Sequence, residues 1–414
     1  MPAAAKPARR EIGEREFVVM MAALMALVAL SIDSMLPALD EIAASLGARD
    51  PNHRQFVIGF YTVGSAIGAL LPGALADRFG RRPVLFGALG CYIVLALVCA
   101  LARNFEMLLA ARALQALGSA GLSVLPGAIM RDRFSGDRMA RLLSTITLVF
   151  MAVPMIAPSY GQLILLFAEW RWIFGGTAIL AALVGAWVWW RLPETLVPEN
   201  RQDIHLATIG TNMLGALSER SAIGYVIGGG VVWAGLFGYL NSSQQLIAEH
   251  FGAGDSFALF FALMAGGMAL ANLTNAGIVM RFGARRVSHS ALFAFVAVAV
   301  LQVWRSFGGG ETLWEFVGLM GAQMCLIAFM GANFTSIALQ PFGRTAGAAA
   351  SAHMFVRSSL SSLLGIAIGQ AFDGTARPIS LALLVGGLIA LGLVLFSERG
   401  QLFRRPNPPY RPTP

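Results

Sequence analysis

The chain has 414 residues, of which 57% are hydrophobic and only 13% are charged, and its formal net charge is +8. Soluble domains average about a quarter charged residues, so this composition excludes a soluble globular protein and predicts a chain surrounded by lipid. The apolar runs are long and continuous, which favours transmembrane α-helices over a β-barrel. The surplus of positive charge does not indicate a nucleic-acid partner, because the arginines lie in short loops where membrane orientation explains them.

Twelve apolar segments follow one another, and each is long enough to cross a bilayer as a helix of about 20 residues. The first follows a basic tail like that of a signal peptide, but it lacks a small-residue cleavage site, so we interpret it as a span. The predicted spans are residues 17–38, 55–77, 84–102, 106–130, 140–166, 172–192, 221–246, 257–280, 287–305, 314–338, 346–370 and 378–397. The sequence therefore predicts an all-α membrane protein with twelve transmembrane helices.

The longest segment between two spans, residues 193–220, is polar and carries charges of both signs. It divides the chain into an N-terminal bundle of six helices over residues 1–192 and a C-terminal bundle of six over residues 221–398. Residues 399–414 are rich in Arg and Pro, which predicts a disordered tail.

The basic residues indicate how the chain crosses the membrane. Most of them lie on the side of the N-terminus, and the other side carries only Arg49, Arg54, Arg103, Arg171, Arg305 and Arg377. By the positive-inside rule, both termini are expected in the cytosol. A basic turn at Gly73–Pro83 has a weaker copy at Arg281–Arg286, which favours one six-helix unit used twice.

Four stretches are similar to signatures of one transporter family. The turn Gly73–Arg82 resembles the loop signature between the second and third spans of the major facilitator superfamily. Leu109–Gly118 resembles the fourth-span motif of its drug/proton antiporters, and Val153–Gly161 resembles their fifth-span motif. Ile32–Leu39 resembles the first span of the bicyclomycin/chloramphenicol-resistance subfamily.

This resemblance implies the major facilitator fold, with two six-helix bundles around a central cavity, and it implies drug/proton antiport. The chain departs from the subfamily at Met35, Gln162, Gln244 and Arg357, where Tyr, Gly, Pro and Gln are usual. These departures concern the substrate and leave the fold untouched.

Two charged residues, Asp33 and Arg112, lie deep within predicted spans, where a charge costs roughly 2.5–3.5 kcal/mol unless it is paired or hydrated. From the rise of an α-helix, we place Asp33 about 24 Å and Arg112 about 21 Å from the cytosolic face. We therefore expect both to face one cavity and to form a proton-coupling pair. Two interpretations remain open: a proton site that substrate displaces, or a fixed ion pair that joins two spans.

Arg357 lies near the middle of the eleventh span, and His353 lies one helical turn earlier on the same face. An arginine at this depth could hold a carboxylate or phosphate of the substrate, and the histidine could titrate near neutral pH. The alternatives are an arginine paired with a backbone carbonyl or with Gln370, and a neutral, packed histidine.

Uncharged polar residues also gather in the spans, where such residues join helices or line cavities. Cavity lining is favoured for Asn241 and Gln244, because the repeat places the seventh span opposite the first. Gln115, Tyr61 and Tyr239 complete the predicted substrate site, with ordinary packing as the alternative for the aromatic residues. The other members are Ser242, Ser243, Gln245, Asn272, Asn275, Gln323 and Asn333.

The basic turn is predicted to take part in conformational change. Its residues are Gly73, Asp77, Arg78, Gly80, Arg81 and Arg82. The glycines allow close approach and a left-handed turn, and the carboxylate suits the N-terminus of a neighbouring helix. By resemblance, this cluster latches the two halves when the cavity faces outward, and a purely topological anchor is the alternative.

Pro154, Pro158 and Gly161 interrupt the fifth span, where backbone groups freed by proline must find partners in neighbouring helices or in water. By resemblance, this motif packs between the halves in exporters, and a generic kink is the alternative.

The sequence thus predicts proton-driven export of a small amphipathic compound by alternating access, from a monomer in the bacterial inner membrane. A proton-coupled importer or carrier of an anionic or zwitterionic metabolite is the alternative. We expect no enzyme activity and no cofactor, because no P-loop, metal cluster or nucleophile–base set is apparent. Cys91, Cys99 and Cys325 lie in apolar runs without metal or redox spacing.

Overall fold

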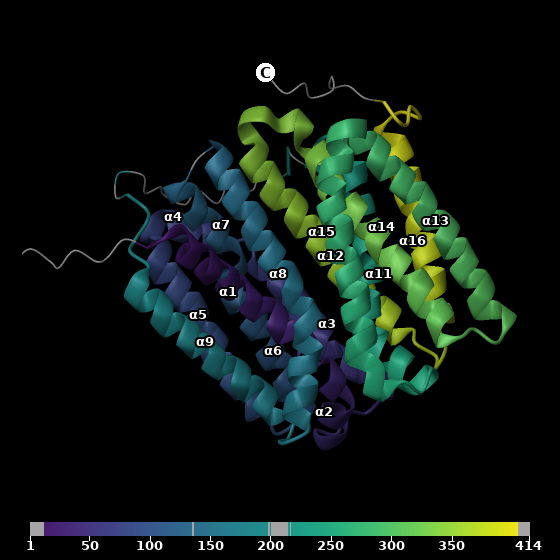
Figure 1. The fold of residues 1–414 in the computed structure, drawn as a ribbon, viewed down its shortest axis with the longest axis horizontal. Helices are drawn as coiled ribbons and strands as arrows, with labels where there is room; N and C mark the ends of the chain where they lie inside the picture. Colours follow the sequence, from purple (N-terminus) through teal and green to yellow (C-terminus); the bar gives the residue numbers. More distant parts are fainter. Residues whose placement is uncertain (1–11, 135, 198, 200–213, 216, 405–414) are drawn as a thin grey trace, which may run out of the picture.

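The computed structural model describes residues 12–404 apart from 135, 198, 200–213 and 216. Helices make up this part of the chain, and no strand occurs within it. Figure 1 shows the helices of the first half beside those of the second half. We call these groups the N-bundle and the C-bundle. Most of the linker predicted at 193–220 lies outside the described residues.

The N-bundle contains nine α-helices and two short 3-10 helices. These are α1 (Glu14–Asp33), η1 (Leu36–Ala38), α2 (Leu39–Ser45), η2 (Pro51–Gln55), α3 (Phe56–Gly68), α4 (Pro72–Phe79), α5 (Arg81–Ala100), α6 (Phe105–Ser119), α7 (Gly121–Arg133), α8 (Gly136–Leu165) and α9 (Arg171–Arg191). The pass formed by α3 and α4 bends by 44°. Pro72 begins the second part of this pass, because proline fits the first turn of a helix but not its interior.

The C-bundle contains six long α-helices. These are α11 (Arg220–Gln244), α12 (Phe257–Phe282), α13 (Ala284–Gly308), α14 (Leu313–Leu339), α15 (Ala346–Gln370) and α16 (Arg377–Ser397). A π-helix, η4 (Gln245–His250), continues α11, and two 3-10 helices, η5 (Gly254–Ser256) and η6 (Gln340–Thr345), precede α12 and α15.

The prediction of an all-α membrane protein is confirmed. Nine helices within the described ranges are long and apolar enough to cross a membrane, and the bent pair α3 and α4 makes a tenth. The 30-residue helix α8 and the 25-residue helix α15 supply two more passes. The helical passes therefore agree with the twelve predicted spans.

The two bundles contact each other mainly along two helix pairs, α8 with α12 and α3 with α15. A Cβ built on Gly266 of α12 would lie 3.2 Å from Met155 of α8, and one built on Gly59 of α3 would collide with Ile366 of α15. Glycines at these positions let the backbones approach closely, as is common between membrane helices.

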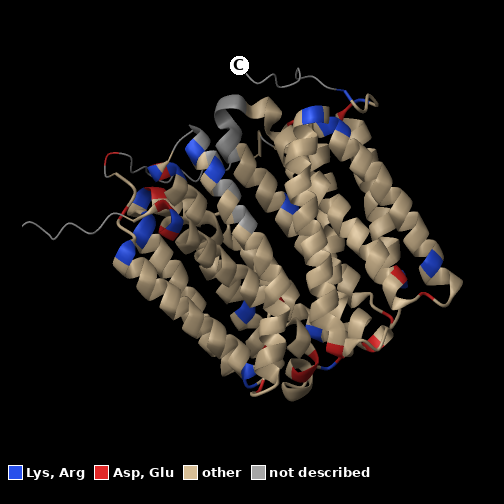
Figure 2. Ribbon diagram, in the orientation of Figure 1, with Lys and Arg blue, Asp and Glu red and all other residues tan. Residues whose placement is uncertain are grey.

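The basic turn and its copy adopt the same backbone conformation. Gly80, between α4 and α5, has a φ of 103°, and Gly283, between α12 and α13, has a φ of 88°. Only glycine adopts this left-handed region easily. Figure 2 shows basic residues gathered where these turns lie, and we call this the basic end of the bundles.

Side chains within the N-bundle hold the first turn. Arg81 forms ion pairs with Asp77 at 2.5 Å and with Asp132 at 2.8 Å. The carboxylate of Glu194 accepts hydrogen bonds from the backbone N–H groups of Arg81 and Arg82, at 2.9 and 3.1 Å. The α5 N-terminus is therefore bound by Glu194, whereas the sequence had suggested Asp77 for such a role.

The first span is shorter as an α-helix than the sequence suggested. Helix α1 ends at Asp33, and the chain continues as η1 with Pro37 at its start. Proline lacks an N–H group and disfavours α-helical geometry in the preceding residue, which explains the break. Asp33 consequently lies at a helix end rather than within a continuous helix.

Gly161 of α8 packs directly against this break. A Cβ built on Gly161 would collide with the carbonyl oxygen of Ser34 and would lie 3.1 Å from Pro37. The fifth-span motif therefore contacts the end of α1, and Met155 of the same helix contacts the C-bundle.

We expect Gly161→Ala to destabilise the protein by about 1–3 kcal/mol, because overpacking forces the backbone to shift. Thermal unfolding in detergent should show a lower midpoint for this variant. Gly127→Ala is the matched control, because a Cβ on that helical glycine meets no atom within 4 Å. Equal midpoints for the two variants would contradict the prediction.

Candidate functional site

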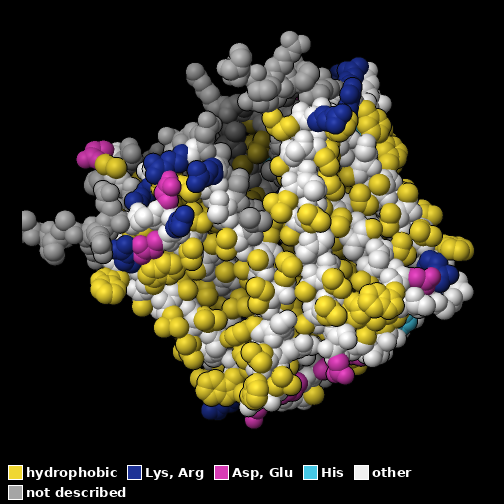
Figure 3. Space-filling view, in the orientation of Figure 1, with side chains coloured by type: hydrophobic (Ala, Val, Ile, Leu, Met, Phe, Trp, Pro, Cys, Tyr) yellow, Lys and Arg dark blue, Asp and Glu magenta, His cyan; other side chains and the backbone are white. Residues whose placement is uncertain are grey.

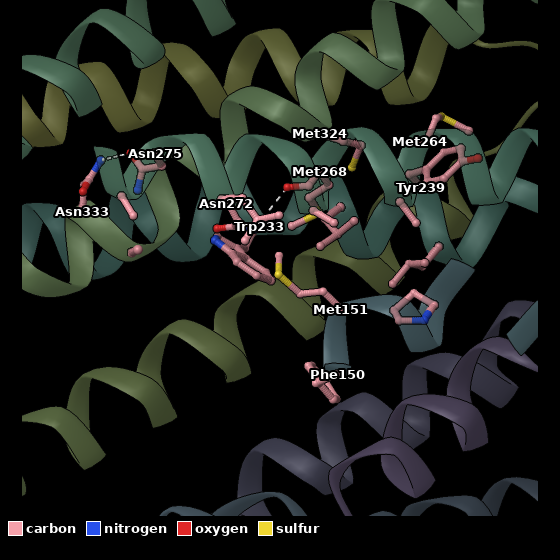
Figure 4. Close-up of a pocket in the computed structure, with 18 of the residues that line it drawn as sticks. Phe150, Met151, Trp233, Tyr239, Met264, Met268, Asn272, Asn275, Met324 and Asn333 are labelled. Carbon is pink, nitrogen blue, oxygen red and sulfur yellow. Dashed lines mark hydrogen bonds between the residues drawn. The ribbon is translucent and has the colours of Figure 1, made fainter. Parts of the chain in front are cut away.

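A cavity of about 930 Å³ lies between the bundles. Most of its described lining residues belong to α11, α12 and α14, and the described residues of the N-bundle in the lining are Asp33, Phe150, Met151 and Pro154. In Figure 4, Met151 and Phe150 lie opposite the labelled residues of the C-bundle. The cavity wall is therefore divided unequally between the bundles, and the C-bundle supplies most of the described lining residues.

The cavity wall is apolar and rich in polarisable side chains. Methionines and aromatic residues line it together, namely Phe150, Met151, Trp233, Tyr239, Phe261, Met264, Met268, Met280 and Met324. Methionine is flexible and adapts to irregular shapes, and it is common at surfaces that bind varied partners. This wall suits an amphipathic molecule of no single shape.

Asp33 is the one charged residue among the described residues that line the cavity. Its exposed fraction is only 5%. An ionised carboxylate in such surroundings needs a compensating partner, which can be a proton or a positive or hydrogen-bonding group. Asp33 therefore lies on the cavity wall, and its ionised form is unstable there without a proton or another compensating group.

Arg112 is held elsewhere in the N-bundle and is fully buried. Its guanidinium donates hydrogen bonds to the side chain and carbonyl oxygens of Ser31, at 2.9 and 3.0 Å, and to Gln115 at 2.8 Å. The ring of Tyr61 stacks on it, with the ring centroid 4.0 Å from Cζ. These bonds attach Arg112 to α1 two residues before Asp33, and they are not an ion pair with that carboxylate.

The remaining predicted substrate residues occupy different positions. Tyr239 lines the cavity, and Gln115 and Tyr61 belong to the buried network of Arg112. Asn241 is 2% exposed and does not line the cavity. Gln244 donates a hydrogen bond to Asp40, away from the cavity lining.

Arg357 and His353 also lie outside the lining. Arg357 donates to the hydroxyl of Thr335 at 2.8 Å, and its Cζ lies 5.5 Å from the ring of Trp233. His353 is buried against Phe342, with ring centroids 5.3 Å apart. Arg357 therefore lies beside Trp233, a residue that does line the cavity.

Polar bridges between the bundles gather at the end opposite the basic end. Arg54 is buried and forms ion pairs with Asp40 of its own bundle and with Glu249 of the C-bundle. Gln244 of α11 binds the same Asp40 carboxylate. We call these four residues the Arg54 cluster.

Amide side chains extend this bridge. Gln245 donates to Asn52 at 2.8 Å and accepts from Gln55. Gln370 donates to the carbonyl oxygen of Asn52 at 2.7 Å, and Asn52 donates to that of Phe372 at 2.8 Å. The bundles are therefore joined through α11, η4 and α15 at this end.

The cavity extends toward the other end. Its lining follows α12 from Phe261 to Met280, two residues before the helix ends at the copy of the basic turn. Figure 3 shows the surface hollowed between the bundles on that side. The described conformation is thus bridged at one end and hollowed toward the basic end.

The Arg54 cluster is not among the predicted site residues. The sequence predicts Arg54 only as a loop cation on the side opposite the termini, and it assigns no role to Asp40 or Glu249. A usable signal was present, since all three charges lie immediately beside the ends of apolar runs on the same side. Among the described residues, no group of His, Cys, Asp or Glu is arranged to hold a metal.

A family model described as Major Facilitator Superfamily matches residues 21–366. A bicyclomycin resistance protein homolog of Haemophilus influenzae is 29% identical over 370 residues, covering 87% of this chain and 91% of that protein. The multidrug resistance protein MdtL of Shewanella oneidensis is 30% identical, covering 88% of this chain and 91% of its own. An uncharacterised MFS-type transporter of Bacillus subtilis, YdgK, is 31% identical, with coverage of 87% and 90%.

Solved structures agree at the level of fold. A D-xylose–proton symporter aligns with a TM-score of 0.68 at 15% identity, covering 93% of this chain and 99% of that chain. The nucleoside transporter NupG aligns with a TM-score of 0.69 at 14% identity, also covering 93% of this chain and 99% of that chain.

Proposed function

Because this chain belongs to the major facilitator superfamily, we propose that it is a proton-driven exporter of small amphipathic compounds. Membership makes the chain a multi-pass membrane transporter rather than an enzyme. The direction of transport and the coupling to protons are our proposal. The single observation that carries it is the placement of Asp33, a buried carboxylate and the one charged residue among the described residues that line the cavity.

In this proposal, Asp33 carries either a proton or the cargo. Cargo entering from the basic end displaces the proton, and a proton entering from the opposite side displaces the cargo. Arg112 keeps the end of α1 in place through Ser31, so that Asp33 projects from a fixed helix end. This assigns to Arg112 a positioning role in place of a direct ion pair.

Alternating access would then require the Arg54 cluster to open and the basic end to close. In the closed basic end, the turn around Gly80 would meet the C-bundle, as its resemblance implies. The positive-inside rule assigns the basic end and both termini to the cytosol. The protein would act as a monomer in the bacterial inner membrane.

The names of the relatives support export, since those in Haemophilus influenzae and Shewanella oneidensis are named for resistance to bicyclomycin and to multiple drugs. The alternative of an anionic metabolite depended on Arg357. That residue is bonded to Thr335 and lies outside the cavity lining, so a carrier of anions would need it to move.

Transport in proteoliposomes tests the proposal. Purified protein would be given tetraphenylphosphonium, chloramphenicol and N-benzylbenzamide under pH gradients of opposite direction. We expect accumulation of cargo on the acidic side, with protons moving the other way, and collapse of accumulation when a protonophore removes the gradient. Accumulation on the alkaline side would identify a symporter, and accumulation independent of the gradient would exclude proton coupling.

A further inference from the structure

Three asparagines interrupt the apolar wall of the C-bundle. Asn272 and Asn275 come from α12 and Asn333 comes from α14, and all three line the cavity. They are the only carboxamides among the described lining residues. Figure 4 shows them along one wall, with Asn272 beside Trp233.

Backbone carbonyl groups fix the orientation of two of these amides. Asn333 Nδ2 lies 2.7 Å from the carbonyl oxygen of Phe329, and Asn272 Nδ2 lies 3.3 Å from that of Met268. A carbonyl oxygen can only accept a hydrogen bond, so the nitrogen of each amide must be at that position. The side-chain oxygens of Asn272 and Asn333 are therefore directed elsewhere.

The third amide is oriented by the first. Asn333 Nδ2 also donates to Asn275 Oδ1 at 3.0 Å, which uses both of its hydrogens. Asn275 must then present its NH2 group away from Asn333. The remaining donors are the NH2 group of Asn275 and the second hydrogen of Asn272 Nδ2, and the remaining acceptors are the side-chain oxygens of Asn272 and Asn333.

We propose that this asparagine trio is a cargo-selecting subsite for an uncharged group in which a hydrogen-bond acceptor lies next to a donor. A secondary amide or a lactam meets this requirement: its C=O accepts from Asn275, and its N–H donates to Asn272 or Asn333. A carboxylate has no donor to offer the two acceptor oxygens, and a hydrocarbon would leave the remaining donors and acceptors of the trio unpaired after displacing water. The inference rests on the proposed function and names the cargo class of the same cavity.

Binding to the purified full chain tests the subsite, with titration calorimetry in detergent as the measurement. The probes are N-benzylbenzamide, its N-methyl derivative, which lacks the N–H group, and tetraphenylphosphonium, which has no hydrogen-bonding group. We expect the secondary amide to bind about tenfold more tightly than the N-methyl derivative, the effect of one buried hydrogen bond with its partner left unpaired. Equal affinities would overturn the inference.

Two variants test whether the asparagine trio causes the tighter binding of the secondary amide. Asn275→Leu should weaken N-benzylbenzamide about tenfold and leave tetraphenylphosphonium unchanged. Asn272→Leu loses only one bond within its own helix and should reduce the preference for the N–H amide, which tests the subsite even if Asn275→Leu misfolds. Thr274→Val is the matched control, because its hydroxyl bonds its own helix outside the lining.

Wild-type affinity for both amides in Asn272→Leu and in folded Asn275→Leu would overturn the subsite. That result, combined with proton-driven movement of tetraphenylphosphonium by the same preparations, would leave the exporter proposal standing. Absence of proton-driven movement of every cargo would overturn the exporter proposal, whatever the amide affinities.

Discussion

Asp33→Asn is expected to abolish proton-driven accumulation of cargo while leaving cargo binding measurable. A pH gradient of one unit stores about 1.4 kcal/mol per proton, so exchange of one proton for one neutral cargo molecule can support about tenfold accumulation. Asparagine keeps the size and polarity of aspartate but does not titrate. The tenfold accumulation should therefore disappear, leaving equal cargo concentrations on both sides, because cargo can still cross but protons no longer drive it.

The measurement is uptake of N-benzylbenzamide into proteoliposomes with and without the gradient, accompanied by a pH-sensitive dye. Glu41→Gln is the matched control, because this carboxylate is exposed on α2 and lies outside the cavity lining. Asp33→Asn with wild-type accumulation and wild-type proton flux would remove Asp33 from the mechanism.

Arg54→Gln is expected to open the end of the molecule that the Arg54 cluster bridges. The change leaves the carboxylates of Asp40 and Glu249 without their shared cation. Breaking a fully buried ion pair costs about 3–5 kcal/mol. Because both carboxylates here are roughly half exposed and screened by solvent, we expect the closed conformation to lose about 2 kcal/mol relative to the open one. That change shifts the ratio of closed to open molecules by about thirtyfold.

Spin labels at Glu41 and Asp255, exposed residues of the two bundles near this end, would report the opening as a longer distance. Cys91, Cys99 and Cys325 would be replaced first so that only these two positions react. Arg103→Gln is the matched control, since Arg103 is exposed in the loop between α5 and α6. Neutralising Asp40 and Glu249 in the Arg54→Gln background should restore part of the closed population. An unchanged distance in Arg54→Gln would show that the cluster does not hold this end closed.

The fold was largely predictable from the sequence because lipid imposes strong rules on it. The length of each apolar run predicts a membrane span, and the repeated basic turn predicts that the two halves are copies of one six-helix unit. Gly80 and Gly283 were identifiable because only glycine adopts the required backbone conformation easily. The end of α1 at Asp33 was less evident, although Pro37 provided a local signal.

The site was less predictable because depth along a helix does not give the direction of a side chain. Asp33 and Arg112 were placed at similar depths, yet Arg112 binds Ser31 and stacks on Tyr61 outside the cavity. Arg357 was also placed at a suitable depth but lies behind the wall. Rotation about each helix axis depends on packing, which a single sequence does not specify.

The Arg54 cluster is hard to predict for a different reason. Asp40, Arg54 and Glu249 come from three segments, and the third lies in the other half of the chain. Each residue alone has the sequence appearance of an ordinary loop charge. The sequence places all three beside the ends of apolar runs on one side, but their contact depends on how the two bundles meet, which a single sequence does not specify.

The unequal division of the cavity wall between the two bundles has a consequence for the evolution of this gene. The N-bundle supplies Asp33 and the buried network of Arg112, whereas α12 and α14 supply much of the described cavity lining. In the proposed mechanism, codon changes in those two helices can therefore alter the range of compounds that bind without disturbing the proton site at Asp33. An exporter of this kind would then broaden a lineage's tolerance of a new toxin by small steps in one half of the protein.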